Sequence, residues 1–306
     1  MALVSAYSRR RAHGASVRDA RTGTVTDLVK PPPGESFMRV TSAGQGVFFL
    51  TTSGRCGPPR SESPTSGPRS DSPTAYRLQI DAAGRAGRLA PVPGDLLPPG
   101  CRLIAASPGG TILAYAVPDM TPPRSTAEVG LVDLATGERR IASPPAGSLG
   151  ELSLSNDAQT VAFQWQPRSG GEVDVYVAAA ADPDWVTQGR VLADTDGLPY
   201  DAASPVISAD GRAVYLTVVQ YEPTGGPHWN RLLDVPADGG QPRVLFQLRY
   251  QPGGGNLVYM WGPVCRDPDG EWLLAFATGY VYHIEISSGA VIRLPFPEGQ
   301  PYDGAW

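Results

Sequence analysis

The chain has 306 residues and a formal net charge of −5, and 41% of its residues are hydrophobic against 18% charged, which excludes wholesale disorder. Its one tight basic cluster is Arg9, Arg10 and Arg11, so the chain lacks the broad basic surface of a nucleic-acid-binding protein. No apolar run approaches the roughly 18 residues of a membrane-spanning helix. Residues 2–7 are too few for the core of a signal peptide. We therefore expect a soluble chain without membrane insertion.

Glycine and proline are frequent, with 36 and 32 residues, which is typical of many short strands joined by turns. In chain order, hairpin-like segments recur at 37–51, 102–117, 151–165, 204–219 and 257–277. In the three clearest, a Ser precedes a tight turn rich in Gly, Asn or Asp, and a β-branched and aromatic run follows. A second hairpin comes after each. Four antiparallel strands in a unit of roughly 50 residues predict the blade of a β-propeller.

We therefore predict one all-β domain, a six-bladed β-propeller with four-stranded antiparallel blades. The predicted blades 2 to 6 span 35–97, 98–147, 148–198, 199–250 and 251–300. Blade 1 is shared by 1–34 and 301–306, so that the N- and C-terminal strands close the ring and remove two sheet edges. The alternative is a frayed tail that ends in Trp306.

The motif Ser208-Ala209-Asp210-Gly211-Arg212 resembles the S-x-D-G-[RK] turn of TolB-like propeller repeats. The run 17–23, which leads to prolines 31–33, is similar to the start of propeller domains common in actinobacterial proteins. The resemblance implies a six-bladed propeller and an extracytoplasmic location behind one membrane anchor. This chain shows no such anchor, so a cytoplasmic location and a fragment of a longer anchored protein both stay open. Fold alone does not specify the ligand.

The predicted propeller has two unequal faces. On one, the connections between second and third strands are long and polar, and we call it the long-loop face. Those loops are predicted at 8–15, 53–74, 118–128, 166–172 and 220–230. The other connections within blades are mostly two to five residues long, except 178–189, and form the short-turn face. Because loops on rigid strands often serve binding, we expect function on the long-loop face. Segment 53–74 is expected to be mobile unless a partner or crosslink holds it.

Two connections on the long-loop face carry the same pattern, with Tyr200 and Asp201 in one and Tyr302 and Asp303 in the other. Both precede innermost strands, so the two carboxylates are expected at the mouth of the central channel. There they can hold a divalent cation, orient a basic ligand or act as an acid–base pair. The alternative is structural: each Asp caps a turn and each Tyr packs between blades. No other cofactor is predicted.

His228 and Trp229 are predicted in the loop 220–230 and suit contact with a sugar, peptide or small molecule. The alternative is that Trp229 folds back over the edge of its blade. His283 alternates with apolar residues in a predicted strand, which indicates a structural role. The sequence contains no G-x-S-x-G, H-E-x-x-H or C-x-x-C motif.

Three cysteines allow one disulfide. Cys56 and Cys101 are expected on the same face of neighbouring blades, whereas Cys265 precedes a turn on the other face. The hypothesis is a Cys56–Cys101 bridge that stabilises the fold by roughly 4 kcal/mol and points to an oxidising compartment. The alternative is three thiols.

These patterns predict a non-catalytic binding or scaffold propeller that recognises a protein, peptide or glycan through its long-loop face. We expect the chain to be a monomer. The alternative is an enzyme, a hydrolase, lyase or cyclase, that uses Asp201 and Asp303 with His228 at the channel mouth.

Overall fold

The computed structural model describes most of the chain. The described residues are 2–9, 12–19, 24–33, 37–52, 75–98, 101–119, 125–168, 173–182, 184–192, 200–221, 227–249, 265–267, 269–277, 280–295 and 303–305. The predicted mobile segment 53–74 lies outside them.

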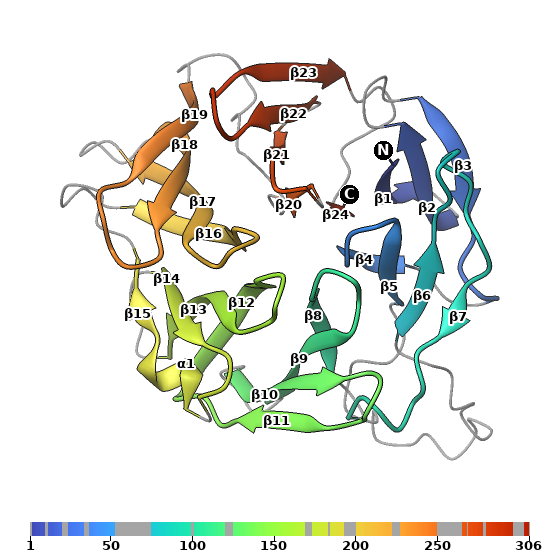
Figure 1. Cartoon of the computed structure of the whole chain (residues 1–306), viewed down its shortest axis with the longest axis horizontal. Coiled ribbons are helices and arrows are strands. Elements are labelled where there is room, and N and C mark those ends of the chain that lie inside the picture. Colours follow the sequence, from blue (N-terminus) through green and yellow to red (C-terminus); the bar gives the residue numbers. More distant parts are fainter. Residues whose placement is uncertain are drawn as a thin grey trace.

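Within the described residues, the strands form six four-stranded antiparallel sheets that follow one another around a ring (Figure 1). From the centre outward, the first sheet contains β24 (Asp303–Ala305), β1 (Ala2–Arg9), β2 (Ala12–Asp19) and β3 (Val25–Val29), and the second contains β4 (Phe37–Ser42), β5 (Val47–Thr52), β6 (Ala75–Gln79) and β7 (Ala90–Pro91). The third contains β8 (Arg102–Ala106), β9 (Ile112–Asp119), β10 (Ser125–Asp133) and β11 (Arg139–Ala142), and the fourth contains β12 (Gly147–Leu154), β13 (Thr160–Pro167), β14 (Asp174–Ala179) and β15 (Arg190–Val191). The fifth contains β16 (Tyr200–Ile207), β17 (Ala213–Tyr221), β18 (Pro227–Pro236) and β19 (Arg243–Arg249), and the sixth contains β20 (Cys265–Arg266), β21 (Trp272–Ala277), β22 (Tyr280–Glu285) and β23 (Val291–Pro295). The prediction of an all-β propeller is confirmed.

The repeated Ser-x-Asp motif builds the turn between the first two strands of a sheet. In the fifth sheet, the Ser208 hydroxyl donates to Asp210 Oδ1 at 2.7 Å and accepts from the backbone N–H of Ala213 at 2.9 Å. Asp210 Oδ1 also accepts from the Arg212 N–H at 3.1 Å. Gly211 takes a φ of 73°, which favours glycine because it has no Cβ. The motif therefore encodes a tight reversal whose polar groups are satisfied locally.

Apolar side chains pack between neighbouring sheets, so the ring has a separate core at each described junction. Five such clusters join the first to the second sheet and so on to the sixth. Representative buried pairs across the five junctions are Val17 with Phe48, Phe49 with Leu113, Leu131 with Phe163, Val177 with Leu216, and Leu232 with Leu273. Burial of this apolar area is the main force that holds the sheets together.

Innermost strands carry bulges, which side chains of the preceding sheet complete. The register of β12 with β13 shifts between Leu149 and Leu152. Arg102 Nη2 from β8 donates to the carbonyl oxygens of Leu149 at 2.8 Å and Gly150 at 3.1 Å. The Leu149 N–H donates to the Thr126 hydroxyl at 2.9 Å, in a buried position. These contacts satisfy backbone groups that the bulge removes from the ladder, and they fix the third sheet against the fourth.

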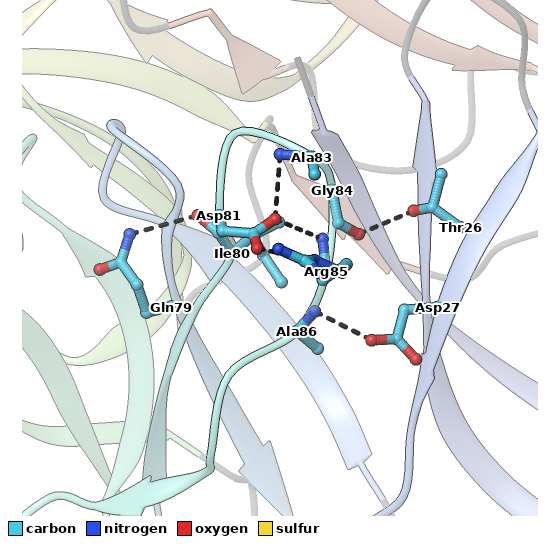
Figure 2. Close-up of polar contacts among 9 residues, drawn as sticks. All are labelled: Thr26, Asp27, Gln79, Ile80, Asp81, Ala83, Gly84, Arg85 and Ala86. Atoms are coloured by element: carbon cyan, nitrogen blue, oxygen red, sulfur yellow. Dashed lines mark hydrogen bonds and ion pairs between the residues drawn. The ribbon is translucent and has the colours of Figure 1, made fainter.

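The first sheet combines N-terminal strands with a strand from near the C-terminus. β24 pairs antiparallel with β1, and Asp303 lies opposite Ala6. The outer strand β3 of this sheet is held by the turn between β6 and β7 (Figure 2). The Thr26 hydroxyl donates to the Gly84 carbonyl at 2.9 Å, and the Ala86 N–H donates to Asp27 Oδ2 at 2.9 Å. The second sheet therefore secures the outer strand of the first sheet.

Replacing Asp27 by alanine is expected to lower the free energy of unfolding by about 1 kcal/mol, because the half-buried Ala86 N–H loses a charged acceptor. Asp27→Asn keeps an acceptor oxygen and should retain most of that stability. Urea unfolding of the two variants and the parent measures the contribution of the Ala86–Asp27 hydrogen bond to stability. Equal midpoints for Asp27→Ala and the parent would contradict it.

Four of the five predicted long loops are shorter than expected, because strand pairing continues into them. Ser8 lies opposite His13, Thr126 opposite Pro118, and Trp229 opposite Gln220. The intervals left between second and third strands are 10–11, 120–124, 168–173 and 222–226. Polar side chains do not prevent pairing, since the ladder is made by backbone groups. On the short-turn face, 180–189 contains α1 (Trp185–Gln188), whose Trp185 ring packs edge-on against Phe163 at 5.1 Å. The expected difference in connection length between the faces was therefore too large.

Candidate functional site

The predicted channel-mouth residues lie on two innermost strands. Tyr200 and Asp201 are the first residues of β16, opposite Gln220 and Val219. Asp303 is the first residue of β24, and Tyr302 lies outside the described residues. Because the sheets repeat one strand order, both strands begin on the long-loop face. Asp201 thus lies near the start of the innermost strand of the fifth sheet and Asp303 at the start of that of the first, with the sixth sheet between them along the ring (Figure 1).

The prediction that His228 and Trp229 lie in a loop was wrong. Both belong to β18, which begins at Pro227. Trp229 is half-buried, pairs with Gln220 and Arg249 on its two sides, and has the Arg231 guanidinium 5.7 Å from its ring centroid. Two-sided backbone pairing and the cation–π contact explain why this segment is strand.

Two of the three cysteines lie in described parts of the chain. Cys101 is buried beside the start of β8, in the core between the second and third sheets, and Cys265 begins β20. Cys56 lies outside the described residues, so the Cys56–Cys101 disulfide stays a prediction. His283 is buried in β22, in agreement with the structural role expected of it.

A pocket that the sequence did not predict lies on the short-turn face, between the third and fourth sheets. Its cavity volume is about 220 Å³. The turn from β8 to β9, the β10–β11 hairpin and the turn from β12 to β13 form its walls. The polar lining includes Ser107, Thr111, Asp133, Glu138, Arg140, Asn156, Asp157 and Gln159, and the apolar lining consists of Ile112, Leu131 and Ala158. The pocket therefore combines an apolar base with a polar rim.

Two carboxylates of the pocket are held ionised by their own turns. Backbone N–H groups of Thr136 and Ala135 donate to Asp133 Oδ1 at 3.0 and 2.8 Å and lower the pKa of Asp133. The Ser155 hydroxyl donates to Asp157 Oδ1 at 2.6 Å, the Gln159 N–H does so at 3.0 Å, and these bonds lower the pKa of Asp157. Both groups therefore carry negative charge at neutral pH.

The turn that carries Asp157 is fixed from two directions. The Asn156 N–H donates to the Ala209 carbonyl of the neighbouring turn at 3.2 Å. Arg266 Nη2, from the innermost strand of the sixth sheet, donates to Asn156 Oδ1 at 2.6 Å. One wall of the pocket is thus bonded to a turn of the fifth sheet and to the innermost strand of the sixth, which limits its movement.

Most residues of this pocket lie in or beside tight turns that the sequence pattern predicts. Asp157 belongs to the repeated turn motif, and Asp133 begins the turn 133–138. Function was instead predicted on the long-loop face. What the pattern could not reveal is that the turns of two different sheets enclose a cavity together, since that depends on the angle between sheets.

The described residues contain no group of three or more His, Cys, Asp or Glu side chains arranged to hold a metal ion. Across the same part of the chain, no helix is long and apolar enough to cross a bilayer.

Fold and pocket together define a β-propeller with a small polar cavity on one face. No family model matches the sequence, and no curated protein does. One solved structure similar to it is TolB from Agrobacterium tumefaciens, with 15% sequence identity and a TM-score of 0.55, over 99% of this chain and 92% of that one. Hydrazine synthase from Kuenenia stuttgartiensis is similar with 15% identity and a TM-score of 0.52, over 97% of this chain and 84% of that one. The β-propeller domain of Cps50 (Swd1) from Myceliophteria thermophila is also similar, with 12% identity and a TM-score of 0.50, over 99% of this chain and 86% of that one. These similarities establish the propeller fold of this chain, and a TolB propeller is among the similar structures.

Proposed function

We propose that this chain is a non-catalytic binding or scaffold propeller and that its partner is a protein. The observation that carries the proposal is the pocket between the third and fourth sheets, which stands on interlocked turns. A rigid site loses little entropy on binding. The short-turn face thereby replaces the long-loop face as the first candidate surface.

The size of the pocket favours a protein over a free ligand. Its volume of about 220 Å³ is below the ~300–1,000 Å³ typical of sites for drug-sized molecules. A cavity of this size accommodates one side chain. Such a pocket contributes to an interface as the place where a partner anchors one residue.

Six blades, ring closure and a monomeric state are part of the same proposal. Each four-stranded sheet is one blade, with the first blade completed by β24. The location proposed from the resemblance to TolB-like repeats is outside the cytoplasm. Cell fractionation with an antibody to the chain tests the location.

An enzyme is the second candidate, because Asp201 and Asp303 both begin innermost strands on the long-loop face. In that case the aspartates act as an acid–base pair or hold a cation at the channel mouth. The Asp201→Asn, Asp303→Asn double variant tests the enzyme candidate through turnover or cation binding, because the proposed partner site lies on the opposite face. If the folded double variant keeps any turnover or cation binding that the parent shows, the enzyme candidate loses its main residues.

Site-specific photocrosslinking tests the binding face. A photoreactive residue at Gln159, exposed on the pocket rim, is compared with one at Val244, which is 47% exposed on the outer strand β19. We expect one protein to crosslink from position 159 and not from 244. The purified partner should then bind the parent chain in solution. A partner that crosslinks only from the outer rim would contradict the proposal.

A further inference from the structure

The pocket has an excess of negative charge. Its rim contains the carboxylates Asp133, Glu138 and Asp157 and one guanidinium, Arg140. These charges lie a few ångströms from any cation bound in the pocket. They act on it more strongly than charges elsewhere on the propeller, because dissolved salt screens interactions beyond roughly 10 Å. The electrostatic field in the pocket therefore favours a positively charged occupant.

The hydrogen-bonding groups on the rim also favour an occupant that donates. Backbone N–H groups and the Ser155 hydroxyl bond to Oδ1 of Asp133 and of Asp157, and the Thr136 side chain also bonds to the Asp133 carboxylate. Asp157 Oδ2 receives no hydrogen bond from the described residues, so it is able to accept one. Asn156 Oδ1 already accepts from Arg266, and Ser107 Oγ accepts from the Ile112 N–H at 3.0 Å. The capacity left on these walls is therefore mainly carboxylate, which an N–H-rich cation satisfies best.

Apolar residues line the same cavity. Leu131 is buried and Ile112 is half-buried in adjacent strands, and Ala158 is buried at a φ of 53° in the turn of the fourth sheet. Arginine and lysine place a methylene stem on apolar surface while the charged group contacts polar atoms. An apolar base with a carboxylate rim matches that division.

We propose that this pocket binds an arginine side chain of the protein partner, with the guanidinium on Asp133 and Asp157 and the stem on Ile112 and Leu131. Arginine is preferred to lysine because its planar group can bond two carboxylates at once. This inference rests on the proposed function, and it names the residue that the partner presents.

The test uses N-acetyl-L-arginine N-methylamide as the probe and the citrulline analogue as its control, which has nearly the same shape without the charge. Titration is followed by amide NMR shifts at Thr111, Glu138 and Gln159. We expect saturable shifts with the arginine probe and an affinity at least about fivefold weaker for citrulline, because a charge-assisted hydrogen bond becomes neutral.

Asp157→Asn has a matched control in Asp210→Asn. Both aspartates accept from a Ser hydroxyl and a backbone N–H in equivalent turns, but only Asp157 lines the pocket. Asp157→Asn should weaken binding of the probe about fivefold, and Asp210→Asn should leave it unchanged. If Asp157→Asn does not fold, exposed Glu138→Gln serves in its place.

Equal affinities for the arginine and citrulline probes, or equal effects of the two Asn variants, would overturn the proposal. So would the absence of binding up to the solubility limit of the probe. In each case the photocrosslinking result stands separately. If a partner crosslinks at position 159 but the arginine probe does not bind, the protein-binding proposal stands and only the proposal of an arginine in the pocket is contradicted.

Discussion

Replacing Gly130 by alanine is expected to lower the free energy of unfolding by about 3 kcal/mol, through overpacking of a cross-strand contact. Gly130 in β10 lies opposite Tyr115 in β9, and a Cβ at Gly130 would be 2.2 Å from Tyr115 Cζ. The tyrosine cannot move aside easily, because its ring is fully buried and its hydroxyl donates to Glu128 Oε1 at 3.0 Å. Urea unfolding monitored by circular dichroism measures the loss.

Gly94→Ala is the control for the chemical change itself. A Cβ at Gly94 meets no atom within 4 Å, so this variant should unfold at the parent midpoint. If Gly130→Ala is as stable as Gly94→Ala, the Tyr115 ring is not packed over Gly130 as described.

The second large effect is a loss of stability in acid that depends on His283. Burial lowers the pKa of His283 from 6.5 to about 4. The unfolded chain therefore binds a proton on this residue between those two values while the folded chain does not. Stability contributed by neutral His283 is present above pH 6.5 and is lost as the pH falls toward 4. The full loss is about 3 kcal/mol.

His283→Leu removes this titration and keeps an apolar group beside its strand partners Leu274 and Ile292. Other acidic groups also affect the stability in acid, and burial raises the pKa of Asp267 above its ordinary value. The quantity to compare is therefore the change in the free energy of unfolding with pH in the parent and in His283→Leu. From pH 7 to pH 4, the parent should lose about 3 kcal/mol more than His283→Leu. Parallel stability curves for the two proteins would refute the assignment.

Much of the fold could be predicted because the repeat has a local physical cause. The Ser208–Asp210 turn closes with its own hydrogen bonds, so its sequence predicts a reversal wherever it occurs. Pairing of β24 with β1 agrees with the expectation that the ends share one sheet. Strand ends were less predictable. The segment around His228 contains glycine and proline and resembles a loop, but backbone pairing with both neighbours extends the strand through it.

Little of the candidate site could be predicted. Asp133 and Asp157 are 24 positions apart in a repeat where acidic turn residues are common, and Asp210 occupies the same kind of turn without lining the pocket. What distinguishes Asp157 from Asp210 is its position beside the β10–β11 hairpin. That position follows from packing between sheets, which local sequence does not encode.

Hydrogen–deuterium exchange of the chain with and without its crosslinked partner shows whether the partner binds at the pocket. Binding through the pocket predicts slower exchange in 107–112, 133–140 and 156–159, with other turns of the same face unchanged. Protection confined to the start of β16 and to the β17–β18 hairpin would place the partner on the long-loop face and contradict the account.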